Sequence, residues 1–185
     1  MAEYYLNAPL SVENARMLRT GDLVFLSGTI YSARDAAHQK LTELLDAGNE
    51  PPFPLQGAVI YYVGPTPAPE GRAIGSAGPT TSYRMDRFAH RLYRLGVKGT
   101  IGKGQRSDAV KQAMKVYGGI YFGATGGAGA LLSTHITAAR VIAFEELGTE
   151  AIRELTVKDL PLLVINDSVG GELYVTPNLA AVGLE

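Results

Sequence analysis

The feature that most constrains the fold is a repeated order of apolar strand, turn and amphipathic helix in the first two thirds of the chain. Residues 23–30 form a strongly apolar strand candidate, and apolar residues recur at helical spacing between residues 34 and 48. A strand that leads through a short turn into a helix is typical of α/β proteins. The same alternation continues, with candidate strands and helices at 58–63, 85–95, 97–101, 107–117 and 120–122.

The last third of the chain has a different pattern, because strand candidates follow one another there. Short apolar runs lie at 140–144, 152–157 and 162–165. We therefore expect a single α/β domain over residues 1–185, with a mixed sheet or two stacked sheets and helices packed on one side. A chain of 185 residues suits one core of this kind, since domains usually run to ~100–200 residues.

Charge and composition exclude several classes of function. The formal net charge is −1, so we expect neither a nucleic-acid partner nor an anionic membrane surface. No apolar run approaches the ~18 residues of a membrane span, and the start lacks a signal-peptide pattern, which predicts a cytoplasmic protein. There are no cysteines, which removes disulfides, thiol catalysis and any iron–sulfur cluster bound by this chain alone. The three histidines lie far apart, so no metal site is expected in this chain.

A turn rich in glycine and hydroxyl residues leads into a predicted helix at residues 75–86. Apolar residues recur three and four apart from Met85 until Gly96, so the Gly-Pro-Thr-Thr-Ser turn is predicted at a helix N-terminus. Helix N-termini favour anions because their N–H groups are unpaired. Arg84 lies four residues after Thr80 and can turn back toward the same point. This favours a carboxylate or phosphate site; the alternative is an ordinary capped helix with a solvated Arg84.

Two further positions combine a cation with a turn. Arg34 and Asp35 lie in a predicted strand-to-helix turn, a common place for functional residues in α/β proteins, and His38 follows one helical turn later. Lys103 lies between two glycines, where the backbone can come close to a ligand. The plainer alternatives are a packed His38 and an exposed hairpin lysine. The glycine-rich loop at 123–129 lacks the context of a dinucleotide site and is interpreted as a close-packing turn.

Three of these stretches resemble a known enzyme family. The motifs are GTIYSARDAAHQKL at 28–41, GPTTSYRMD at 78–86 and IGKG at 101–104. They resemble the C-terminal, or β, part of the iron–sulfur-dependent hydro-lyases, which comprise the class I fumarate hydratases and the L-tartrate dehydratases. The segment from 143 to 174 is similar to the closing part of that family, so the resemblance covers nearly the whole chain.

The resemblance implies a swivelling β/β/α domain that works in a two-subunit enzyme. In that family a larger α partner carries a 4Fe–4S cluster on three cysteines and leaves one iron open. The implied assembly is a heterodimer or an α2β2 heterotetramer, with self-association of this chain as a further option. The implied substrate is a small dicarboxylate.

The resemblance also assigns roles to residues of the matching motifs. It implies that Arg34 binds a substrate carboxylate and that Arg84 and Lys103 complete the clamp on the dicarboxylate. Thr80 is implied as the base that takes the proton from carbon, and Thr81 beside it as a further contact to substrate.

The proton transfer has a second candidate. His38 is implied as an acid–base group in the tartrate branch of the family, and its ordinary pKa of ~6.5 suits that work. A threonine hydroxyl is a weak base, although cations and a helix N-terminus would lower the pKa of Thr80. We favour Thr80 for the direct step. Tyr83 stands where some fumarases have glycine, so the wall of the pocket is expected to differ.

Three functions are consistent with these residues. The first is a fumarate hydratase β subunit in the citric acid cycle, a lyase that interconverts (S)-malate and fumarate only together with its α partner. The second is an L-tartrate dehydratase β subunit, which would form oxaloacetate. The third is a non-catalytic anion-binding module of the same fold. In the enzymes, cations on the carboxylate next to C3 would stabilise the charge that builds up when the C3 proton leaves.

Overall fold

The chain folds around one mixed sheet. The computed structural model describes residues 1–124 and 129–174. Within them, seven strands are hydrogen-bonded in the order β1-β2-β3-β4-β5-β7-β6. The strands are β1 (Glu3–Ala8), β2 (Leu23–Ser32), β3 (Val59–Tyr61), β4 (Gly99–Gly102), β5 (Ile120–Gly123), β6 (Ile136–Ala143) and β7 (Ile152–Asn166).

An additional pairing between β2 and β7 closes part of this sheet on itself. The strands β2, β3, β4, β5 and β7 thereby form a closed, barrel-like ring. β1 extends one side of the ring through parallel pairing with β2, and β6 extends it through antiparallel pairing with β7. The expected mixed sheet is confirmed, whereas the alternative of two stacked sheets is not what these strands form. The swivelling-domain detail stays a prediction.

β7 corrects the predicted end of the chain, because the two short strands expected at 152–157 and 162–165 are one 15-residue strand. Between them, the backbone of Asp159 has φ +49°, and its N–H donates to the Ser27 hydroxyl at 3.0 Å. The register against β2 shifts at this point. The register shift is accommodated by a β-bulge, and the strand continues through Pro161. β6 also begins earlier than the predicted residue 140.

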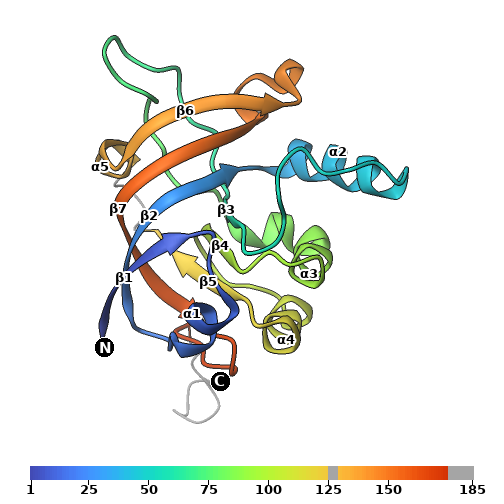
Figure 1. Cartoon of the computed structure of the whole chain (residues 1–185), viewed down its shortest axis with the longest axis vertical. Helices are drawn as coiled ribbons and strands as arrows, with labels where there is room; N and C mark the ends of the chain where they lie inside the picture. The colour runs from blue at the N-terminus through green and yellow to red at the C-terminus, as the bar shows by residue number, and fades with distance from the viewer. Residues whose placement is uncertain (125–128, 175–185) are drawn as a thin grey trace, which may run out of the picture.

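Three helices cover one side of the sheet, as Figure 1 shows for α2, α3 and α4. This confirms the expected packing of helices on one side for these three, while the short helix α5 lies across the sheet from them. The helices are α1 (Val12–Met17), α2 (Asp35–Asp46), α3 (Asp86–Arg94), α4 (Asp108–Tyr117) and α5 (Gly129–Thr134), with 3-10 turns η1 (Ser82–Met85) and η2 (Glu145–Glu150).

Local sequence explains the helix ends. The Ser11 hydroxyl accepts the Asn14 N–H at 2.9 Å and caps α1. α4 ends at Gly118, whose φ of +68° is the left-handed conformation that glycine adopts most easily. Ser107 precedes α4 but makes no side-chain capping bond within the described residues; its N–H donates to the Asp86 carboxylate at 2.6 Å.

The core has two main parts, and β3 contributes to both. Val59 and Tyr61 belong to the cluster inside the closed sheet, whereas Ile60 belongs to the cluster between the sheet and helices α2 and α3. A strand buried on both faces reads as a continuous apolar run, which is how 58–63 appears in the sequence. Within the described residues, no helix combines the length and the apolar character needed to span a bilayer.

Candidate functional site

The candidate residues gather where parallel strands end. β2, β3, β4 and β5 are neighbours and run in the same direction, so their carboxyl ends meet at one edge of the sheet. Arg34 follows β2 and Lys103 follows β4 directly. Ligands of α/β proteins bind at such edges because the loops after the strands converge there. The structure therefore places these two cations on the same edge, with β3 between their strands.

The segment from Thr80 to Ser82 lies across the ends of β3 and β4. The Thr80 N–H donates to the Tyr62 carbonyl at 2.7 Å, the Lys103 N–H donates to the Thr80 carbonyl at 3.3 Å, and the Ser82 N–H donates to the Lys103 carbonyl at 2.8 Å. Thr81 forms a parallel bridge with Lys103. The segment is thus held like a further strand, which brings Thr80, Thr81 and Lys103 together.

This arrangement corrects the expected helix N-terminus. The N–H groups of Thr80 and Ser82 are used by the sheet, so they are not free to bind an anion. α3 begins only at Asp86, after the 3-10 turn η1. Thr81 precedes η1 but makes no side-chain capping bond within the described residues, so ordinary capping does not describe the turn either.

The arginines form a second group, at the start of α2. The Arg34 Nη2 atom lies 3.4 Å from Glu150 Oε1 and 3.8 Å from Asp35 Oδ2. The Arg84 Nε atom donates to Asp35 Oδ1 at 2.9 Å. A single carboxylate therefore lies between two guanidinium groups. Arg84 is 45 % exposed and ion-paired, so it is neither simply solvated nor bonded to Thr80.

Glu150 positions this second group from a distant part of the chain. Its Oε2 atom accepts the Ala36 N–H at 3.1 Å and so caps α2, since Arg34 itself makes no side-chain cap within the described residues. Gly64, after β3, leaves room for Arg34, because a Cβ atom there would lie 2.9 Å from Arg34 Nη1. The side chain of Arg34 is thereby confined between β3 and η2.

Hydrogen-bonding capacity is left over in this group. Within the described residues, four buried side-chain polar atoms have no hydrogen-bond partner, and three of them are Arg34 Nε, Asp35 Oδ2 and His38 Nε2. An unsatisfied buried polar atom costs about 1–3 kcal/mol. Three of them in one five-residue segment are consistent with a site that a polar ligand completes.

His38 is packed between α2 and α3. It is fully buried, with its ring stacked on Phe88 at 5.6 Å and edge-on to Tyr62 at 5.5 Å. The Nδ1 atom lies 2.8 Å from the Arg34 carbonyl and therefore carries the proton, which leaves Nε2 as an acceptor. Burial lowers the pKa of His38 to about 4, and the charge of Arg106 acts in the same direction. The imidazole is therefore neutral at pH 7, in the packed environment that the plainer alternative describes.

Lys103 is exposed to solvent, whereas Gly102 before it is buried against the protein. Thr80 and Thr81 are half-buried. A Cβ atom at Gly102 would lie 2.0 Å from the Ser82 hydroxyl, so this glycine serves close packing within the protein rather than the approach of a ligand. Tyr83, where the sequence departs from some fumarases, is 67 % exposed.

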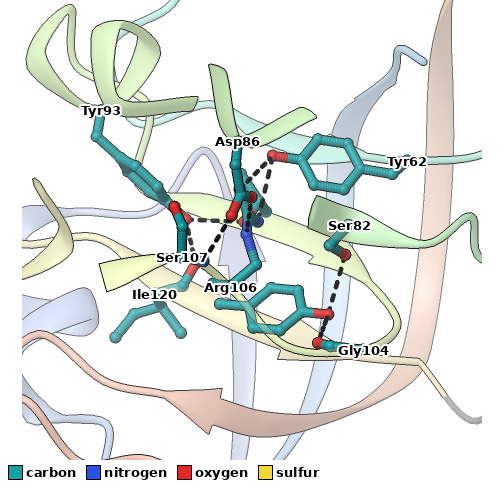
Figure 2. Close-up of polar contacts among 10 residues, drawn as sticks. Tyr62, Ser82, Asp86, Tyr93, Gly104, Arg106, Ser107 and Ile120 are labelled. Atoms are coloured by element: carbon teal, nitrogen blue, oxygen red, sulfur yellow. Dashed lines mark hydrogen bonds and ion pairs between the residues drawn. The ribbon is translucent and has the colours of Figure 1, made fainter. Parts of the chain in front are cut away.

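Beneath the Thr80 segment lies a buried network that the sequence analysis missed. Arg106 is only 4 % exposed; its Nε donates to Asp86 Oδ1 at 2.7 Å and its Nη1 to the Thr100 hydroxyl at 3.1 Å (Figure 2). The guanidinium also lies 5.3 Å from the Tyr62 ring and 5.0 Å from the Tyr121 ring. No linear pattern joins these residues, although Asp86 and Arg106 both stand just before or at a helix start.

The charge of Arg106 is well compensated. Burial acts to lower its pKa, but Tyr62, Tyr93 and Asp86 outweigh this effect and raise the pKa above its ordinary value. Asp86 also accepts the Ser107 N–H, so the ion pair ties the start of α3 to the start of α4. This arginine is a structural cation, in contrast to Arg34 and Arg84.

Fold and site together define a class of protein: an α/β domain with a closed mixed sheet and a cationic candidate site at the carboxyl ends of its parallel strands. The family model described as "Fumarase C-terminus" matches residues 2–177. The chain belongs to this family, which confirms the resemblance drawn from its motifs.

Individual relatives carry two kinds of name. "Fumarate hydratase 2" of Leishmania major is 41 % identical over 156 residues, which are 83 % of this chain and 28 % of that protein. "Fumarate hydratase class I, anaerobic" of Escherichia coli K12 is 41 % identical over 151 residues, 80 % of this chain and 28 % of that protein. "Putative L(+)-tartrate dehydratase subunit beta" of Methanocaldococcus jannaschii is 36 % identical over 182 residues, 95 % and 93 % of the two chains. The chain thus spans less than a third of these fumarate hydratases and nearly all of the tartrate dehydratase subunit.

Proposed function

We propose that this chain is the β subunit of an iron–sulfur hydro-lyase that reversibly dehydrates (S)-malate to fumarate. The observation that carries the proposal is the placement of Arg34, Thr80 and Lys103 on one edge of parallel strands, in a chain that belongs to the fumarase C-terminus family. Relatives named fumarate hydratase, a hydro-lyase activity, support the reaction class.

The cluster itself does not fit the residues of this chain. The sequence has no cysteine, and within the described residues no group of three or more His, Asp or Glu is placed to hold a metal ion. We therefore assign a 4Fe–4S cluster to a partner α subunit. Bound there, the cluster would supply Lewis-acid chemistry for the dehydration.

The cations of this chain would bind and orient the dicarboxylate. Arg34 and Arg84 both form ion pairs with the Asp35 carboxylate, a group of the kind that we propose they bind in the substrate. Guanidinium groups bind carboxylates in a fixed plane and so orient the substrate. Lys103, exposed beside Thr81, would neutralise charge on the second carboxylate. Together these cations stabilise the negative charge that develops when the C3 proton leaves.

Thr80 is the better candidate for the proton transfer. Its side chain is half-buried in the segment beside Lys103, whereas His38 is enclosed by Tyr62 and Phe88. His38 instead donates to the Arg34 carbonyl, so its contribution is to fix the turn that carries Arg34. A cation near the Thr80 hydroxyl would lower its pKa and so raise the fraction present as the alkoxide, the form that accepts a proton.

The second candidate function is an L-tartrate dehydratase β subunit. It is favoured by the Methanocaldococcus jannaschii relative, which matches along nearly its whole length and is itself named a subunit beta. Its site residues and partner would be the same, and its product would be oxaloacetate. A non-catalytic anion-binding module is the outcome if neither acid is turned over.

The test is an anaerobic assay of the chain together with its cluster-bearing partner, using (S)-malate and L-tartrate in parallel. We expect turnover by the complex and none by the chain alone. Robust turnover without the partner would contradict the two-subunit assignment. The mass of the complex in solution distinguishes a heterodimer from an α2β2 assembly, and the mass of the free chain reports its self-association.

Arg84→Lys sharpens this assay, because it keeps the charge and loses the planar fork. We expect KM to rise by about tenfold or more, with a fall in kcat. Arg87→Lys is the matched control, since Arg87 is exposed on α3, three residues after Arg84, and lies over the Phe88 ring at 4.4 Å. Equal kinetics in both variants would remove Arg84 from the substrate clamp.

A further inference from the structure

The hydroxyl of Tyr121 joins the two segments that carry the candidate site. It lies 2.9 Å from the Ser82 hydroxyl and donates to the Gly104 carbonyl at 2.8 Å. Figure 2 labels Ser82 and Gly104, the two residues that this hydroxyl joins. Ser82 directly follows Thr81, and Gly104 directly follows Lys103. One buried oxygen atom thus connects the proton-transfer segment with the lysine loop.

The direction of these hydrogen bonds is determined by the donor count. A tyrosine hydroxyl has one proton, and Tyr121 gives it to the Gly104 carbonyl. Ser82 must therefore donate to Tyr121. Burial raises the pKa of Tyr121, so the phenol is neutral at physiological pH and keeps this arrangement.

Tyr121 is itself firmly held. It lies on β5, where it pairs with Thr100 of β4 and with Asn166 of β7. The residue is fully buried, with the Arg106 guanidinium 5.0 Å from its ring. A rigid strand therefore supports the bridge from below, whereas Lys103 and Thr81 on top are partly or largely exposed.

We propose that Tyr121 is a positioning residue that sets the separation between the Thr80–Thr81 segment and Lys103. Two backbone bonds already link these segments, but one of them, from the Lys103 N–H to the Thr80 carbonyl, is 3.3 Å long. The Ser82–Tyr121–Gly104 bridge is the side-chain link on the buried face of the same pair of segments. The expected effect of this bridge on catalysis rests on the proposed function, whereas its expected effect on the separation of the two backbone segments does not.

The chain offers a matched control in Tyr93. This tyrosine is also buried; its hydroxyl lies 2.8 Å from the Thr100 hydroxyl and donates to the Ile120 carbonyl at 3.1 Å. It belongs to the same buried network, yet neither of its partners adjoins Thr80 or Lys103 in sequence. Tyr121→Phe and Tyr93→Phe thus each remove one buried, doubly bonded hydroxyl.

The first measurement is amide hydrogen exchange of the free chain, read at Ser82 and Lys103. We expect exchange at both amides to be about tenfold faster in Tyr121→Phe than in the wild type, because local opening becomes easier. Tyr93→Phe should leave both amides unchanged. Unchanged protection in Tyr121→Phe, or the same increase in both variants, would overturn the inference. Ser82→Ala cuts the bridge from its other end and gives the same readout if Tyr121→Phe fails to fold.

The second measurement is kinetic, with the chain assembled with its partner and assayed on (S)-malate and L-tartrate. We expect kcat to fall about 10- to 100-fold in Tyr121→Phe, since small displacements of reacting groups cost that much. Tyr93→Phe should keep kcat within about threefold at a similar melting temperature. Equal losses of kcat in the two variants would overturn the catalytic part. An inactive wild-type complex would instead contradict the proposed function, while the exchange data would still decide the role of Tyr121.

Discussion

The pair Arg34 and Arg84 and the single Arg106 lie in contrasting environments, although all three form ion pairs. Arg34 and Arg84 have side chains that are 22 % and 45 % exposed, and the Arg34 Nε atom lacks a partner within the described residues. The Arg106 side chain is 0 % exposed, and each of its nitrogen atoms has a partner. Arg34 thus keeps an unused donor, as expected if it binds a ligand, whereas every guanidinium nitrogen of Arg106 already has a partner within the protein.

Arg106→Met tests the structural side of this comparison and should have the largest effect. Removing Arg106 leaves the Asp86 carboxylate buried without its counter-charge, so we expect the free energy of unfolding to fall by about 3–5 kcal/mol. Arg84→Met should change it by less than about 1 kcal/mol, because its ion pair is half-exposed. Denaturant unfolding of both variants provides the measurement. Adding Asp86→Asn to Arg106→Met removes the unpaired carboxylate charge and should recover part of the lost stability. Equal stability of Arg106→Met and Arg84→Met would contradict the comparison.

His38, whose Nδ1 atom bonds the Arg34 carbonyl, is expected to make the stability of the chain depend on pH. Its pKa is about 4 in the folded chain against 6.5 ordinarily, so the unfolded chain binds the proton first as pH falls. The stability due to neutral His38 is complete above about pH 6.5 and is lost progressively toward pH 4, by roughly 3 kcal/mol in total. Unfolding measured from pH 4 to pH 7 should show this slope. His38→Gln should flatten it and the exposed His90→Gln should not; a slope that survives in His38→Gln would assign it to other groups.

Thr80→Val tests the ligand side through catalysis. Loss of the hydroxyl should lower kcat by ~10²-fold or more, the usual worth of a positioned base, with little change in KM. The melting temperature should stay close to that of the wild type, since Thr80 makes its two backbone bonds without the side chain. Thr137→Val, which removes an exposed hydroxyl on β6, is the control. A destabilised but fully active Thr80→Val enzyme would end its assignment as the base.

Glu150→Gln should have the smallest effect and sharpens the account of Arg34. The amide oxygen can still accept the Ala36 N–H, but the charge facing Arg34 is lost. We expect KM to rise about three- to tenfold with little change in stability, as for a partly exposed ion pair. Glu146→Gln in the same 3-10 turn is the control, because Glu146 pairs with the partly exposed Lys40 and not with Arg34. The same KM in both variants would show that Glu150 does not position Arg34.

The sequence by itself determined the elements whose signals are local. The alternation of apolar strands and amphipathic helices predicted β2 to β5 and helices α2 to α4, because periodicity and glycine stops are read over a few residues. The motifs containing Arg34, Thr80 and Lys103 predicted the family, which the comparisons confirmed over residues 2–177. The predicted glycine-rich loop at 123–129 lies partly outside the described residues, so its conformation stays a prediction.

Only the tertiary structure decided how distant segments meet. The closure of the sheet depends on pairing β2 with β7, which are more than a hundred residues apart and carry no matching pattern. Glu150 reaches Ala36 across 114 residues, and Ser82 reaches Tyr121 across 39. The N–H groups of the Thr80 turn were expected to be free. Their acceptors, the carbonyls of Tyr62 and Lys103, lie just after two other strands and could not be foreseen from residue spacing. Such hydrogen bonds depend on which distant segments become neighbours in the folded chain, and residue spacing does not encode these neighbours.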